Sequence, residues 1–228
     1  MLRLKIRLTF DFAKNEIHKK YHRDIFFNLV NSQLNYDDTT EAANMLNLKE
    51  DAYYRVVSFH SIPEDQKEKY SLKQLDEVDI IADQISMFYP KDHIYKNVSQ
   101  IVMLQKMDSD KEDDDSRKRL NELIDIVKKS ISKRDQNTNF NVGVGEIVKG
   151  YRNLKNSYKQ SRIAMKFMKI ARRITGDINK SIVYYSKLGI FQSFIELDDI
   201  NKLKKMYHAQ LLNSIIMIEN IIQSYYIL

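Results

Sequence analysis

The stretch from Asn139 to Lys169, NFNVGVGEIVKGYRNLKNSYKQSRIAMKFMK, predicts a strand, a turn and a helix in that order. The strand shows the period-two alternation of a half-buried segment, carried by Phe140, Val142 and Val144. Gly143 and Gly145 lie in this run, where the missing Cβ lets another segment pack closely. After Gly150, helical spacing predicts a core-facing stripe of Leu154, Tyr158, Ser161, Met165 and Met168.

The amino-terminal residues carry two patterns. Met1 to Phe12 alternates apolar and basic residues, which taken alone predicts a strand. From Phe12 onward the spacing predicts a long amphipathic helix to about Leu34, with an apolar stripe of Ile17, Tyr21, Ile25 and Leu29. Asp38 or Thr39 can then cap a short helix.

The middle of the chain alternates strand and helix patterns. Tyr54 to His60 is the expected first strand, and Ser71 to Met87 is a helix laid on the sheet. Tyr95 to Met107 predicts a hairpin that turns near Asn97, and a helix follows from about Ser116 to Ser132. The order β-α-β-β-α-β-α-β predicts an α+β fold of the ferredoxin-like type, with an antiparallel-rich sheet and helices packed mainly on one face.

Several motifs, in the same order along the chain, resemble the GGDEF-like domain of bacterial transcription regulators of the PucR/CdaR family. Gly143 and Gly145 lie in a segment similar to the V-G-I-G strand of that family. The S-Y-x-x-A-x-x-A helix that follows it is matched by Ser157, Tyr158 and Ala164, with Ser161 in place of the first alanine.

Two further motifs extend the resemblance over most of residues 40–195. The segment SIVYYSKLGIFQSF is similar to a short strand followed by a Leu-Gly-aromatic helix start, carried by Leu188, Gly189, Ile190 and Phe191. An acidic pair often precedes this motif in the family, but Ser186 and Lys187 stand there in this chain. Asn47 stands where the family has a glycine at a helix end, and asparagine tolerates the left-handed conformation needed there.

The resemblance implies a nucleotide-cyclase type of fold and three parts. Residues 1–48 are expected to form linking helices, residues 49–195 the GGDEF-like α/β domain, and residues 196–228 helices that lead to a DNA-binding module, which we expect to lie outside this chain. The implied function is that of a non-catalytic regulatory or oligomerisation domain, which relays a signal to the DNA-binding module of a transcription regulator. A nucleotide- or small-molecule-binding sensor and a direct nucleic-acid-binding protein remain as alternatives.

Catalysis is not expected. An active diguanylate cyclase has a GG[DE]EF loop on the central hairpin, but this chain has KNVSQIVML between Tyr95 and Met107. The first strand offers only Ser58, His60 and Ser61 where a metal carboxylate would be needed. We therefore expect no enzyme activity and no cofactor.

Other candidate metal or phosphate sites are poorly matched. Asp108, Asp110 and Glu112 alternate as calcium ligands do, but Asp113 and Arg119 stand where the EF-hand loop needs glycine and glutamate, so a solvated loop is expected instead. His18 and His22 are four residues apart without a third zinc ligand in sight. Close packing explains the two strand glycines better than a phosphate loop, because no Lys-Ser pair follows them.

Composition limits the compartment and the partners. The chain has 228 residues, a formal charge of +6 and no cysteine, so neither a disulfide framework nor thiolate chemistry is expected. Its apolar runs are too short to span a membrane. We expect a cytoplasmic protein that contacts DNA only indirectly, through the module outside this chain. No polar constellation indicates an effector.

Two surfaces of the expected fold are candidates for contact with partners. Five cations keep strict 4-3-4-3 spacing on one side of the helix after Gly150: Lys155, Lys159, Arg162, Lys166 and Lys169. This basic face either meets phosphates or an acidic partner, or is simply solvated. Both terminal helices carry apolar stripes, the second containing Ile215, Ile218, Ile221, Ile222 and Tyr225. Either both helices fold back on their own domain, or the stripes form the contact of a homodimer, which we expect.

Overall fold

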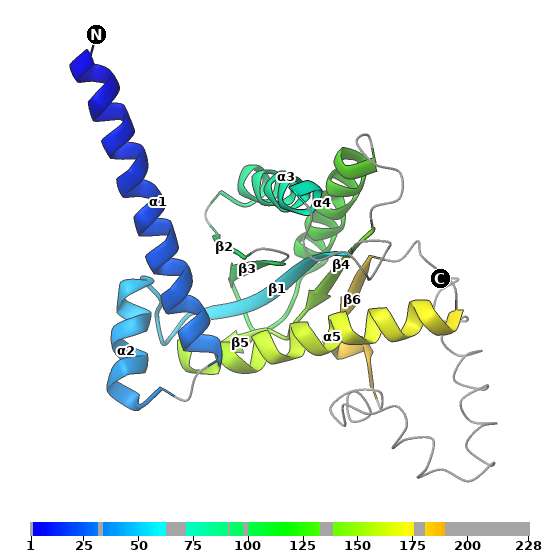
Figure 1. The fold of residues 1–228 in the computed structure, drawn as a ribbon. Helices are drawn as coiled ribbons and strands as arrows, with labels where there is room; N and C mark the ends of the chain where they lie inside the picture. The colour runs from blue at the N-terminus through cyan, green and yellow to red at the C-terminus, as the bar shows by residue number, and fades with distance from the viewer. Residues whose placement is uncertain are drawn as a thin grey trace, which may run out of the picture.

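The computed structural model describes residues 2–31, 34–62, 72–90, 92–97, 100–132, 139–175 and 181–189. They form helices around a six-stranded sheet with the order β2-β3-β1-β4-β6, in which β5 (Val148–Lys149) pairs with the start of β1. The mixed α+β class predicted from the sequence is confirmed (Figure 1). Among the described residues, no helix has the length and apolar character needed to cross a membrane.

The sheet is built around β1 (Tyr53–Ile62), which pairs antiparallel with β3 (Gln100–Met107) on one side and with β4 (Asn139–Val144) on the other. β2 (His93–Lys96) extends the sheet beyond β3, and β6 (Ile182–Tyr184) runs parallel to β4. Strands β1 to β4 thus form the ferredoxin-like arrangement, in which each crossover places one strand between the two that it connects.

One face of the sheet is covered by α3 (Leu72–Phe88) and α4 (Asp114–Ser132). Val57 and Phe59 point from β1 toward this face and join the buried side chains of both helices in one core cluster. The apolar stripe of α3 that packs on the sheet includes Val78, Ile81 and Ile85.

The opposite face is also covered, so the prediction that helices lie mainly on one face is wrong. There α5 (Leu154–Thr175) crosses the sheet, and α1 (Leu2–Asn31) and α2 (Tyr36–Met45) pack beside it (Figure 1). Tyr54 and Val56 of β1 point toward these helices. Strand β4 is therefore buried on both sides rather than half-buried. Asn141, on the side of β4 that faces α5, is inaccessible to solvent.

The predicted strand over Met1 to Phe12 is wrong, because α1 is continuous from Leu2. A strand needs a neighbour for its backbone hydrogen bonds, and in the described part of the chain none pairs with this segment. A helix satisfies these groups internally, and this outweighs the apolar alternation. The beginning of α1 stands clear of the domain body, whereas its end packs on it through Phe26, Leu29 and Val30 (Figure 1).

The short helix α2 begins and ends with specific caps. Its N-cap is Asn35, whose side chain accepts a hydrogen bond from the Asp38 N–H, so the predicted cap at Asp38 or Thr39 is wrong. The side-chain oxygen of Asn35 caps a helix as that of aspartate does. Because Asn35 stands three residues before Asp38, Asp38 lies in the first turn of α2. At the other end Asn47 has φ of 53°, which confirms the left-handed conformation predicted for it.

The last described elements are β6 and a short 3-10 helix, Tyr185–Lys187. They confirm the predicted short strand. The helix start predicted at Ile190, the carboxy-terminal helices and the apolar stripe around Ile218 lie outside the described residues.

Candidate functional site

The predicted family-signature residues hold α5 against the sheet. A Cβ added to Gly143 would lie 2.0 Å from the carbonyl oxygen of Ser161, and one added to Gly145 would lie 2.2 Å from that of Ser157. Close packing is therefore the role of both glycines. Tyr158 and Ala164 are buried on the same helix, while Leu188 is buried beyond β6 and precedes Gly189, whose φ is 51°.

Two serines of α5 complete this contact with hydrogen bonds. Ser157 Oγ accepts from the Val56 N–H at 2.9 Å and donates to the Glu146 carbonyl oxygen at 2.7 Å. Ser161 Oγ lies 2.8 Å from Ser58 Oγ on β1. Ser161, which replaces the family's alanine, thus gives the buried Ser58 hydroxyl a hydrogen-bond partner.

The basic face of α5 is exposed at Lys155, Lys159, Arg162 and Lys166, and the side chain of Lys169 lies outside the described residues. The guanidinium carbon of Arg162 lies 5.8 Å from the centre of the Tyr158 ring. These cations lie on the side of the sheet opposite to α3 and α4, and so they are separate from the groove described next.

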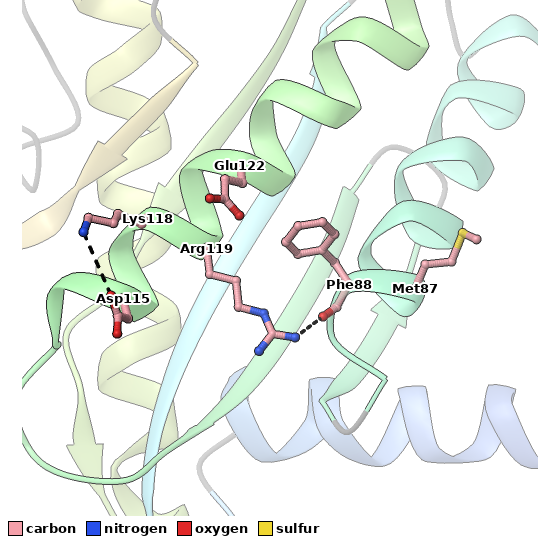
Figure 2. Close-up of a pocket in the computed structure, with 6 residues that line it drawn as sticks. All are labelled: Met87, Phe88, Asp115, Lys118, Arg119 and Glu122. Carbon is pink, nitrogen blue, oxygen red and sulfur yellow. Dashed lines mark hydrogen bonds and ion pairs between the residues drawn. The ribbon is translucent and has the colours of Figure 1, made fainter.

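A groove of about 470 Å³ lies between the end of α3 and the start of α4 (Figure 2). Its lining residues are Met87, Phe88, Asp115, Lys118, Arg119 and Glu122. Arg119 donates a hydrogen bond of 2.7 Å to the Phe88 carbonyl oxygen, and its guanidinium carbon lies 5.0 Å from the centre of the Tyr89 ring. Arg119 therefore lies between the groove and Tyr89, whose ring borders a cluster of buried polar side chains.

Those polar groups centre on Arg55, a β1 residue of which only 2% is exposed. Its Nε and Nη2 donate to Gln105 Oε1 at 3.0 and 2.8 Å, and its Nη1 forms an ion pair with Glu112. The Glu112 carboxylate also accepts from Arg117 at 3.3 Å. One carboxylate is thus shared by two guanidinium groups.

Two tyrosines complete the cluster. The Tyr184 ring lies 5.6 Å from the guanidinium carbon of Arg117. The hydroxyl groups of Tyr89 and Tyr184 are buried, and neither forms a well-aligned hydrogen bond with the described residues. Burial raises the pKa of Tyr184 to about 12, and it also raises the pKa of Tyr89. Both side chains therefore remain neutral donors at physiological pH.

Asp92 lies at the edge of the same cluster. Burial raises the pKa of its carboxyl group to about 6, although the Lys106 N–H and the positive charge of Arg119 partly offset the effect. Asp92 therefore changes charge near neutral pH, which an exposed aspartate does not do.

The sequence predictions missed this cluster. The acidic run predicts a solvated loop for Glu112, whereas Glu112 pairs with Arg55 in the interior. The available signal was the arginine itself, because YYRVV places a charged residue inside an otherwise buried strand, and such a residue needs a partner. Its partner cannot be read from the sequence, since Glu112 lies 57 residues away.

Histidines and acidic residues do not gather into a metal site in the described part of the chain. The His18 and His22 rings on α1 are tilted by 44° to each other, with centres 4.1 Å apart. At the end of β1, His60 lies in register between Gln100 and Asn141, both neutral. The two segments 53–62 and 93–107, which form β1 and the β2–β3 hairpin, contain no aspartate or glutamate.

The GGDEF-like domain model matches residues 32–167 of the chain. This range covers more than half of the chain, which therefore belongs to the GGDEF-like domain family. It begins directly after α1, ends within α5, and includes both Arg55 and Glu112. The chain matches no curated protein.

Proposed function

We propose that this chain contains a non-catalytic regulatory and oligomerisation domain of a transcription regulator of the PucR/CdaR type. In this role it relays a signal from α1 to a DNA-binding module, and it acts in the cytoplasm as a homodimer. The observation that carries the non-catalytic part is the absence of acidic residues from the β1 and β2–β3 segments. Two-metal phosphoryl transfer needs carboxylates to hold the ions beside the nucleotide.

Incubation with GTP and magnesium or manganese tests this part. No cyclic dinucleotide should form above the blank, while an active diguanylate cyclase assayed in parallel should give product. Turnover that depends on the protein and survives further purification would refute the non-catalytic assignment.

The relay is supported by the contact between α1 and the body of the domain. The rings of Phe26 and Tyr95 are stacked with centres 4.0 Å apart, which joins α1 to β2. Phe26 and Phe27 each approach Tyr158 edge-on, with ring centres 6.4 and 6.3 Å away, which joins α1 to α5. A movement of α1 therefore acts directly on the helix that leads toward the carboxy-terminal residues.

The predicted apolar stripe of α1 divides into two parts. Leu29 is buried and Ile25 partly buried against the domain's own core, so this end folds back on its own domain. Ile17 and Tyr21 are 70% and 53% exposed, and Tyr21 contacts the exposed Met45. We propose that a second copy covers the exposed part, because an isologous contact hides the same patch on both subunits.

Light scattering of the full chain at micromolar concentration tests the dimer. The wild-type protein should have the mass of a dimer, and the double variant Ile17→Asp with Tyr21→Asp should be a monomer. Lys19→Asp adds an acidic group on the opposite side of α1, two residues from both positions, and should leave the dimer intact. A wild-type monomer at every concentration would contradict the proposal.

A further inference from the structure

The cluster around Arg55 has more hydrogen-bond donors than acceptors. Arg55 and Arg117 share the Glu112 carboxylate, and the buried hydroxyls of Tyr89 and Tyr184 have no well-aligned acceptor among the described residues. Native proteins rarely leave buried polar groups unpaired, so each such group requires an explanation. Asp92 supplies a second carboxyl group at the edge of the cluster, but no described group accepts a hydrogen bond from the Tyr184 hydroxyl.

A phosphate group has the chemistry that the cluster needs. Guanidinium groups bind phosphate through paired, charge-assisted hydrogen bonds. A carboxylate has two oxygens, and those of Glu112 are already used by the two arginines. A phosphate has further oxygens, which can accept from tyrosine hydroxyls as well. Both tyrosines stay protonated near neutral pH, so they can donate to it.

Glu112 can leave this position without disturbing a strand or a helix. It lies between β3 and α4, and residues 108–111, which precede it, are exposed. Arg117 is 46% exposed, so one side of the ion-paired group already reaches solvent. The carboxylate of Asp115 in the first turn of α4 is 97% exposed, where water screens its charge.

We infer that the cluster of Arg55, Arg117, Tyr89 and Tyr184 binds the phosphate group of a small molecule, and that Glu112 occupies this phosphate site when the ligand is absent. Arg55 is five residues from His60 along β1, so the site lies about 17 Å from the hairpin end of the sheet. The inference goes beyond the proposed regulatory role and concerns binding alone. Its failure would leave the tests with GTP and light scattering unaffected.

Removal of the internal carboxylate tests the phosphate site. Glu112→Ala in the full chain should lower the thermal unfolding midpoint, and inorganic phosphate should restore it in a saturable manner. Sodium chloride at equal ionic strength should not restore it, and acetate should act more weakly than phosphate. The phosphate Kd of Glu112→Ala should be at least about tenfold lower than that of the wild-type protein.

Asp115→Ala is the matched control, because it removes one acidic group from the adjacent turn without touching the cluster. Its response to phosphate should equal that of the wild-type protein. Adding Tyr184→Phe or Arg117→Gln to Glu112→Ala should weaken phosphate binding. If phosphate stabilises the single and double variants equally, the ion binds elsewhere and the inference is wrong.

Glu112→Gln keeps the assay informative if the alanine variant does not fold. The amide can still accept from Arg55 but no longer competes as an anion, so this variant should also bind phosphate more tightly than the wild-type protein. If neither Glu112 variant gains stabilisation specific to phosphate, the inference is overturned.

Discussion

Gly143→Ala tests the packing of α5 on the sheet. The new methyl carbon would lie 2.0 Å from the Ser161 carbonyl oxygen, 2.7 Å from Met165 Cγ and 3.0 Å from Met165 N. The methionine side chain can change its rotamer, but the two backbone atoms belong to a 22-residue helix. Ordinary contact therefore requires α5 and β4 to separate by more than an ångström.

The cost follows from what this separation exposes. Overpacking of a core usually costs about 1–3 kcal/mol, and the value rises when backbone must move. The helix also loses its hydrogen bond to Ser58 and part of the burial of Tyr158, so we expect a loss of about 3 kcal/mol or more. That is a large part of the stability of a typical domain, which is about 5–15 kcal/mol.

Urea denaturation measured by circular dichroism gives the free energy of unfolding of the variant and of its control. Gly189→Ala is a suitable control, because no atom of the described residues lies within 4 Å of its added methyl group. Its φ of 51° should cost about 1–2 kcal/mol through left-handed strain alone. If Gly143→Ala destabilises the protein no more than Gly189→Ala, the close contact between α5 and β4 is not as described.

Three further predictions concern stability. Met165→Asp should lose several kcal/mol because it buries an unpaired charge, whereas the exposed neighbouring change Lys166→Glu should lose at most about 0.5 kcal/mol; equal losses would mean that the face of α5 is misassigned. Asp92 has a folded-state pKa raised to about 6, so its contribution to stability is present below pH 4 and lost as the pH rises through 6. Asp92→Asn should therefore raise the free energy of unfolding at pH 8 by about 2 kcal/mol and leave it unchanged at pH 4, and an equal effect at both pH values would contradict the burial of this carboxyl group. Ser161→Ala should cost about 1 kcal/mol by leaving the Ser58 hydroxyl unpaired, and adding Ser58→Ala should recover most of that loss; strictly additive losses would show that the two hydroxyls do not interact.

The fold was predictable where burial sets the spacing of residues. The stripe of α5 from Leu154 to Met168 is buried as predicted, because one side of this part of the helix faces the sheet. The hairpin was also predicted, and its turn is closed by a hydrogen bond from the Asn97 N–H to the Gln100 carbonyl oxygen. Local patterns of this kind need no information about distant residues.

The charged cluster and the second covered face were not predictable in the same way. Covering the sheet on both sides depends on where α1 and α5 pack, which the period-two pattern of one strand does not contain. The pairing of Arg55 with Glu112 depends on the loop before α4 folding over the start of β1. An acidic run such as DSDKEDDD has the same sequence signature whether all of its carboxylates are solvated or one of them is inserted into the core.

The contacts of α5 bear on the proposed relay of a signal from α1. Where a helix packs through long flexible side chains, a displacement of the helix can be accommodated by rotamer changes without moving its neighbours. Here Gly143 and Gly145 allow the backbone of α5 to contact β4 directly, and Ser157 and Ser161 form hydrogen bonds to β1. Few side chains are therefore left whose rotamers could accommodate a displacement of α5. The aromatic contact of Phe26 with Tyr158 then joins α1 to a helix that can move only together with the sheet. Such rigid coupling favours transmission of a movement of α1 across the domain, and it depends on the glycine and serine positions.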